Sequence, residues 1–202
     1  MVGFERSNFS DPVLRDFCNP QMATFDCRQT GRFFAPSPGF DMPLPPDAAR
    51  GRDVFVGRPF NISGVAVAGV DGASFVMNQV GTCATCHNAR NVGTNVEGHL
   101  MDLGISRKEL QNPERPLYVF KNKPTGDERQ TTDPGRALVS GRWADMDCFK
   151  VPGLRELGKR APYFHDGSAD TFEAVVNHYE DRFQLNLSAQ ERADLLAFLA
   201  AL

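Results

Sequence analysis

The sequence predicts a mainly α fold, because its C-terminal third contains two segments with the signals of capped, amphipathic helices. Asp170 and Glu173 form a capping box at the start of one segment, and Ser188 and Glu191 form another at the start of the next. Each box precedes a stripe of apolar side chains at helical spacing: Phe172, Val175, Val176 and Tyr179, then Leu195, Phe198, Leu199 and Leu202. Stripes of this kind are typical of helices that share one core.

A third helix is predicted from Asp47, which can cap it, to about Val56. Ala48, Gly51 and Phe55 fall on one side of this helix. Glycine is costly inside a helix, so Gly51 indicates that another backbone approaches closely at that point. The segment therefore predicts a helix that packs tightly against a second one.

The first 46 residues are predicted to form an irregular arm. Pro36-Ser37-Pro38-Gly39, followed by Pro43, Pro45 and Pro46, favours extended or turn backbone over helix. The predicted organisation is therefore an arm at residues 1–46 and one domain at residues 47–202.

A short β-hairpin is predicted as an insertion between residues 60 and 80. β-Branched residues lie on both sides of Asp71-Gly72 in this segment, and Asp-Gly is a common hairpin turn. Residues 91–104, further along, read as a loop.

The composition is ordinary for a globular protein, with 41% hydrophobic and 23% charged residues in a chain of 202. A net charge of −3 argues against a nucleic-acid or anionic-lipid partner. No apolar run reaches the length of a membrane span.

The segment Cys83-Ala84-Thr85-Cys86-His87 has the Cys-x-x-Cys-His pattern by which c-type haem is attached. Two thiols at this spacing can form thioethers to neighbouring vinyl groups, and the adjacent His87 is placed as the proximal iron ligand. A zinc site would need a second Cys/His pair at ligand spacing, and a thioredoxin-type motif would lie in a βαβ pattern. The sequence has neither, so it predicts one covalent haem c in a cytochrome c-like domain whose first and last helices cross.

Three cysteines remain outside the motif: Cys18, Cys27 and Cys148. In an oxidising compartment Cys18 and Cys27 could close a short loop, which would leave Cys148 unpaired. The alternative is that all three are small buried apolar residues.

The haem motif indicates a periplasmic protein, because bacteria attach haem to Cys-x-x-Cys-His outside the cytoplasm. The N-terminal residues 1–5 lack the apolar region of a secretory signal. We expect the sequence to be a processed chain, an expressed fragment or the C-terminal part of a longer protein.

The C-terminal third resembles the C-terminal haem domain of the bacterial di-haem cytochrome c peroxidase family, which includes the related di-haem enzyme that matures tryptophan tryptophylquinone. The residues that carry the resemblance, with the upstream motif, cover about residues 47–202. They are Asp133-Pro134-Gly135-Arg136, Phe149-Lys150-Val151-Pro152-Gly153-Leu154-Arg155, Ala161-Pro162-Tyr163-Phe164-His165-Asp166-Gly167-Ser168 and Leu195-Leu196-Ala197-Phe198-Leu199.

The resemblance implies that Arg155 contacts a haem propionate, which suits a planar guanidinium facing a carboxylate. It also places backbone carbonyls around Arg160 and Pro162 where the family binds calcium between its two domains. Family enzymes carry two haem motifs and this sequence has one. A partner or a further N-terminal segment would supply the second haem, or the protein is a single-haem relative.

The distal iron ligand is left open between a tyrosine and two methionines. The resemblance places Tyr179 where the peroxidases have a distal Met and the tryptophylquinone-forming enzyme has Tyr, and helical spacing puts Tyr179 on the inward face. A tyrosinate is a hard donor that lowers the potential of the iron. Met146 and Met101 are the alternatives, since a thioether is the usual distal ligand in electron carriers. His99, His165 and His178 are further candidates.

The resemblance implies a haem oxidoreductase that relays electrons to or from a second redox centre. Peroxide reduction or a related oxidation would require the partner haem. Two other interpretations stay open: a single-haem electron-transfer cytochrome without a substrate, and a haem-based sensor.

Overall fold

The computed structural model describes residues 43–69, 72–87, 99–106, 114–154 and 156–202. The predicted arm at 1–46 lies almost wholly outside these ranges, and so do Cys18, Cys27 and Arg155. The proposed Cys18–Cys27 bridge and the propionate contact of Arg155 therefore stay predictions.

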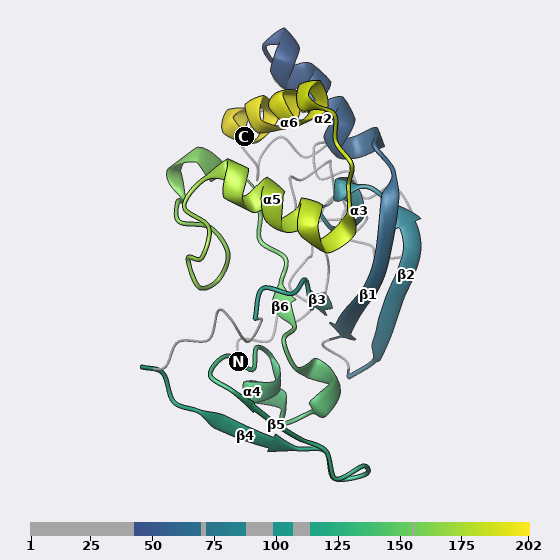
Figure 1. Ribbon diagram of the computed structural model, residues 1–202, viewed down its shortest axis with the longest axis vertical. Helices are drawn as coiled ribbons and strands as arrows, with labels where there is room; N and C mark the ends of the chain where they lie inside the picture. Colours follow the sequence, from purple (N-terminus) through teal and green to yellow (C-terminus); the bar gives the residue numbers. More distant parts are fainter. Residues whose placement is uncertain (1–42, 70–71, 88–98, 107–113, 155) are drawn as a thin grey trace, which may run out of the picture.

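The longer helices gather at one end of the molecule, and a small hairpin lies at the other (Figure 1). The α-helices are α2 (Pro46–Gly57), α3 (Cys83–Cys86), α4 (Ala137–Ser140), α5 (Phe172–Phe183) and α6 (Ala189–Ala201). Two 3₁₀ turns, η5 and η6, span Trp143–Asp145 and Leu157–Lys159. No helix among the described residues is long and apolar enough to cross a membrane.

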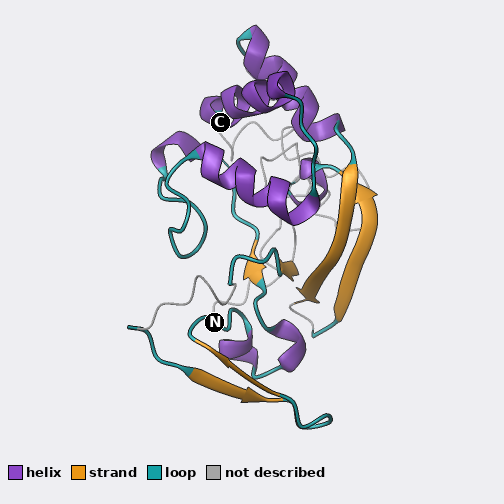
Figure 2. Cartoon of the chain, viewed as in Figure 1, coloured by secondary structure: helices purple, strands orange, loops and turns teal. Residues whose placement is uncertain are grey.

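Two antiparallel sheets accompany the helices (Figure 2). The larger has the order β2-β1-β3-β6, from strands Ser74–Gly81, Phe60–Gly69, His99–Met101 and Phe149–Lys150. The smaller pairs β4 (Tyr118–Lys121) with β5 (Glu128–Thr131).

The strands are more extensive than the sequence predicts, so the mainly α description is not confirmed. The hairpin predicted at residues 60–80 is present as β1 and β2, but β1 also pairs with β3. β3 lies within the segment predicted as a loop, and β6 joins it from further along the chain. The short β3 and β6 have no periodicity of their own, and only pairing with distant residues makes them strands.

The helix start predicted at α6 holds, whereas those at α2 and α5 need correction. α2 begins at Pro46 with Pro45 as its N-cap, so Asp47 lies in the first turn and is not the cap. At α6 the Ser188 side chain accepts a hydrogen bond from the Glu191 N–H at 3.2 Å, and Glu191 accepts one from the Ser188 N–H at 2.8 Å. At α5 the N-cap is Thr171 and not the predicted Asp170, because Thr171 has extended backbone and its hydroxyl accepts from the Ala174 N–H at 3.2 Å.

The predicted close approach at Gly51 is present, between α2 and α6. A Cβ atom at Gly51 would lie 1.9 Å from the carbonyl oxygen of Asp194. The Asp194 carboxylate accepts two hydrogen bonds from the Arg50 guanidinium, at 2.6 and 2.8 Å, and these lower the pKa of the carboxyl. Phe55 packs on Phe198 with the ring centroids 5.5 Å apart.

The buried apolar residues form two cores, and α5 contributes to both. The first joins α2 and α6 through Phe55, Leu154, Val176, Leu195, Phe198, Leu199 and Leu202. The second lies between the larger sheet and the end of α5: Ile62, Val65, Val67, Met101, Leu103, Val151, Phe183 and Leu185.

We expect Gly51→Ala to lower the free energy of unfolding by about 1–3 kcal/mol, because the new methyl group overlaps the backbone of α6. Gly57→Ala, at the end of the same helix, is the matched control, since its Cβ would meet nothing within 4 Å. We expect it to be neutral or to stabilise by about 0.5–1 kcal/mol. Urea unfolding followed by circular dichroism measures both, and equal effects would contradict the prediction.

Candidate functional site

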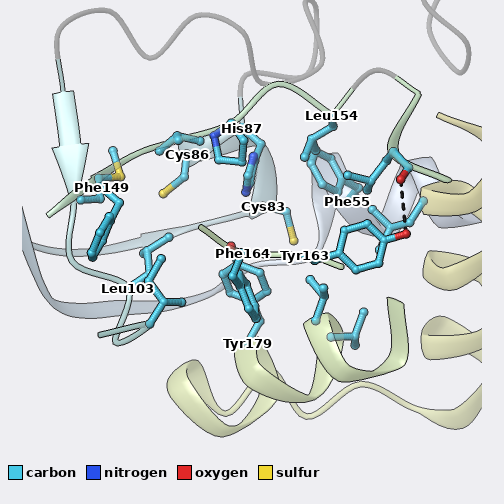
Figure 3. A pocket seen from close by; sticks show the side chains of 18 of the residues that line it. Phe55, Cys83, Cys86, His87, Leu103, Phe149, Leu154, Tyr163, Phe164 and Tyr179 are labelled. Atoms are coloured by element: carbon cyan, nitrogen blue, oxygen red, sulfur yellow. Dashed lines mark hydrogen bonds between the residues drawn. The ribbon is translucent and has the colours of Figure 1, made fainter. Parts of the chain in front are cut away.

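A cavity of about 340 Å³ lies where α2, α3, α5 and α6 meet the larger sheet. Its walls are mainly apolar and aromatic, and the residues of the Cys-x-x-Cys-His motif lie along one side (Figure 3). A cavity of this size and character can enclose a largely apolar ligand.

The motif forms a single helical turn whose start is fixed by two threonines. The Thr82 N–H donates to the Thr85 hydroxyl at 2.9 Å, and the His87 N–H donates to the Cys83 carbonyl at 3.0 Å. This turn places Cys83, Cys86 and His87 along the same cavity.

His87 is buried at the end of this turn. Burial lowers the pKa of its imidazole to about 4, although the backbone carbonyl of Pro152 acts in the opposite direction. The imidazole is therefore neutral at physiological pH, which is the form that ligates a metal. Its Nδ1 is a buried atom without a hydrogen bond of good geometry to any described residue. The neutral imidazole lines the cavity and is therefore a candidate ligand for a metal ion there.

Both motif cysteines are free thiols. Burial raises the pKa of Cys83 to about 12 and also raises the pKa of Cys86. A redox-active Cys-x-x-Cys needs a thiol whose pKa is lowered, because the thiolate is the nucleophile. The surroundings of these two thiols therefore argue against a thioredoxin-type function.

Tyr179 extends from α5 on the side of the cavity opposite His87 (Figure 3). Its ring stacks on Phe183 with centroids 6.3 Å apart and meets the edge of Phe164 at 6.4 Å. Burial, followed by the nearby Cys86 and Cys83, raises the pKa of the phenol. Tyr179 is therefore a neutral phenol at physiological pH unless a positive charge enters the cavity.

Of the other candidate ligands, the structure places some at the cavity and others away from it. Met101, on β3, is buried and lines the cavity, whereas Met146 is buried outside its lining. His178 points elsewhere and hydrogen-bonds the Leu103 carbonyl at 2.9 Å. His165 lines the cavity, hydrogen-bonds the Asp133 carboxylate and stacks on Phe149, so its ring is already held.

The side chains of two cationic residues at the cavity were not singled out as ligand contacts from the sequence. Lys150 and Arg160 both line it. The Arg160 guanidinium donates to the Gly153 carbonyl at 3.0 Å, and the Lys150 ammonium donates to the Val151 carbonyl at 3.3 Å. The Phe149–Arg155 block contains Lys150, but its place at the cavity depends on the pairing of β6 with β3, which no local pattern signals.

No group of three or more His, Cys, Asp or Glu side chains that could hold a metal ion occurs in the described ranges. The calcium site expected at the carbonyls of Arg160 and Pro162 would use backbone oxygens and stays a prediction.

No family model matches the chain. Among curated proteins it is 33% identical over 133 residues to the cytochrome-c peroxidase IdrP2 of Denitromonas iodatirespirans, a match covering 60% of this chain and 36% of that protein. It is 35% identical over 122 residues to the cytochrome c551 peroxidase of Nitrosomonas europaea, covering 59% and 30% of the two chains.

A shorter match joins the chain to the methylamine utilization protein MauG of Methylorubrum extorquens, with 43% identity over 66 residues, 27% of this chain and 19% of MauG. A crystal structure of a MauG-like protein associated with microbial copper homeostasis aligns over 80% of this chain and 45% of its own, with 22% identity and a TM-score of 0.46.

A Cys-x-x-Cys-His turn facing an apolar cavity closed by helices is the arrangement of a c-type haem domain. The sequence matches agree with this: the chain is similar to the C-terminal haem domain of the bacterial di-haem cytochrome c peroxidases and MauG. The match spans about a third of the length of the two peroxidases.

Proposed function

We propose that the cavity holds one haem c, attached through Cys83 and Cys86, with His87 as the proximal iron ligand. The observation that carries the proposal is that two half-buried thiols and a buried, neutral imidazole line one apolar cavity from a single helical turn. The haem would supply one-electron exchange at its iron. The first and last described helices, α2 and α6, would cross beside it as in c-type haem folds.

The chain would hold the two ends of the haem differently. Apolar residues would enclose the porphyrin, and Lys150 and Arg160 would bind its propionates together with the predicted Arg155. A guanidinium or ammonium facing a carboxylate makes a strong, charge-assisted hydrogen bond. Both cations now donate to backbone carbonyls at the cavity, so they need only turn toward a propionate.

Tyr179 is the distal ligand that the geometry supports best, because it lies across the cavity from His87. Its raised pKa means that the phenolate is costly in the apolar cavity. A bound metal ion reverses that cost by supplying positive charge next to the oxygen. Tyr179 would therefore give up its proton only on ligation.

The domain would act as an oxidoreductase that passes electrons between a donor and a second redox centre, in the periplasm. Peroxide reduction or a related oxidation would follow only when a second haem domain is present, and calcium would bind between the two domains. The support for this role is the family relationship, since the matched relatives are named as cytochrome c peroxidases.

A single-haem electron carrier is the second candidate function. The observation in its favour is the thioether of Met101, which also lines the cavity and is the kind of distal ligand that such carriers use.

We expect the chain, produced with the periplasmic haem-attachment machinery, to gain the mass of one haem. Cys83→Ala and Cys86→Ala should each lose one thioether, and the double variant should carry no covalent haem. Cys148→Ala is the control, because its buried side chain lies outside the cavity lining. Intact-mass spectrometry under denaturing conditions measures the attachment, and an unmodified mass for the parent chain would overturn the proposal.

We expect Tyr179→Phe to change the absorption spectrum of the oxidised holoprotein, because it removes an anionic oxygen ligand from the iron. Tyr163→Phe is the matched control: Tyr163 also lines the cavity, but its hydroxyl donates to the Leu157 carbonyl at 3.3 Å. Tyr163→Phe should leave the spectrum unchanged. A spectrum that responds to Met101→Leu and not to Tyr179→Phe would instead identify Met101 as the ligand and support the electron carrier.

We expect the single-haem chain alone to reduce hydrogen peroxide no faster than free haem when a reduced small cytochrome is the donor. A polypeptide that joins this domain to a second haem domain should turn over peroxide. Stopped-flow oxidation of the donor cytochrome measures both rates. Turnover by the isolated domain would contradict the dependence on a partner haem.

A further inference from the structure

A second cavity, of about 420 Å³, lies beside the first. Phe149 and Lys150 line both cavities, so β6 contributes to the wall between them. The Phe149 ring stacks on His165 with centroids 3.7 Å apart, and the imidazole of His165 hydrogen-bonds the carboxylate of Asp133. Because His165 lines the first cavity and Asp133 the second, this stack and its hydrogen bond separate the two spaces.

The lining of the second cavity is positively charged. Arg115, Arg136 and Lys150 line it, whereas Asp133 is the one carboxylate among the described residues of its lining. That carboxylate already accepts a hydrogen bond from His165. The cavity therefore presents more positive than negative charge to a ligand.

The positive charge of Arg136 is only partly balanced by the neighbouring carboxylate. Its Nε lies 3.3 Å from the carboxylate of Asp145, and the Arg142 guanidinium lies 3.9 Å from the same carboxylate. Asp145 is fully buried, and its single negative charge faces two guanidinium groups. This cluster of three groups keeps a net positive charge next to the cavity.

The rest of the wall is mainly apolar, apart from the hydroxyl-bearing side chains of Tyr118 and Thr132. Leu100 from β3, Leu138 from α4 and Phe149 from β6 contribute apolar side chains to it. The volume lies within the range of small-molecule sites, which combine apolar walls with a few charged groups that orient the ligand. An inorganic anion would use the cations and leave the apolar surface unfilled.

We propose that the second cavity is a binding site for a small organic anion, an aromatic carboxylate in its simplest form. The ring lies against Leu138 and Phe149, and the carboxylate is held by Arg115 and Arg136, while Lys150 is left to the haem propionates. The site does not depend on the haem, because most of these residues lie outside the first cavity.

Isothermal titration calorimetry of the holoprotein at physiological salt tests the proposal with three probes. 2-Naphthoate has the ring and the charge, its methyl ester has the ring alone, and inorganic phosphate has the charge alone. We expect 2-naphthoate to bind with a Kd below about 1 mM, and at least about tenfold more tightly than either of the others, which is the loss expected for one charge-assisted contact.

Two neighbouring residues on α4 provide a matched pair of variants. Leu138 lines the cavity and is 53% exposed, whereas Val139 is 89% exposed and does not line it. Leu138→Glu should weaken 2-naphthoate at least about fivefold by repulsion, and Val139→Glu should change it less than about twofold, since salt screens the more distant charge. Arg115→Gln, at an exposed position, should weaken binding about as much as Leu138→Glu.

Equal affinity for the acid and its ester, or for the acid and phosphate, would overturn the proposal. Equal effects of Leu138→Glu and Val139→Glu would overturn it as well, because they would place the anion elsewhere. Covalent haem is measured separately by mass, so a failure of the anion site leaves the proposed haem function intact, and the reverse also holds.

Discussion

The position of the cavity depends on how closely α2 and α6 approach each other. Gly51 lies so near the carbonyl of Asp194 that no side chain fits between the helices. One turn further along α2, this approach holds Phe55 against Phe198, and the Phe55 ring also lies 6.1 Å from the ring of His87. The Phe55 ring therefore links the motif to the helix pair, and loosening that pair would weaken the support of His87.

The motif helix α3 lies between two cores and contacts both. Cys83 and its neighbour Ala84 pack against the first, while Cys86 packs against the second. Helix α5 joins the same two cores from the other side of the cavity, since it contributes Val176 to one and Phe183 to the other. Tyr179 lies between these two residues on α5, and its side chain faces the cavity. The two walls of the cavity are thus fixed by the same packing, which sets their separation.

Local signals in the sequence predicted the parts of the structure that local interactions determine. The capping residues of α6, the apolar stripes of α5 and α6 and the close approach at Gly51 all follow from residues near one another in the chain. The one-residue error at α5 arose because Asp170 and Thr171 are both good capping residues, and only the backbone conformation decides between them.

The residues missed from the sequence depend on distant pairing. β6 has two residues and becomes a strand only beside β3, yet this pairing brings Lys150 to both cavities and Phe149 to the wall between them. Met101 and Met146 look alike in the sequence, and only the sheet order places Met101 at the cavity and Met146 outside its lining. No single motif signals the second cavity, because its cations come from separate segments.

Burial holds the side chains of the motif and of Tyr179, all at the first cavity, in their uncharged forms. It raises the pKa values of Cys83, Cys86 and Tyr179 and lowers that of His87, so acids and bases alike are neutral at physiological pH. An apolar cavity of this kind favours a ligand that does not require a thiolate and that can be coordinated by a neutral imidazole. Thioether formation removes both thiol protons permanently, and a metal ion provides the positive charge that a phenolate of Tyr179 requires. The features that make these residues poor acids, bases and nucleophiles on their own are the features that suit them to surround a covalently attached metal cofactor.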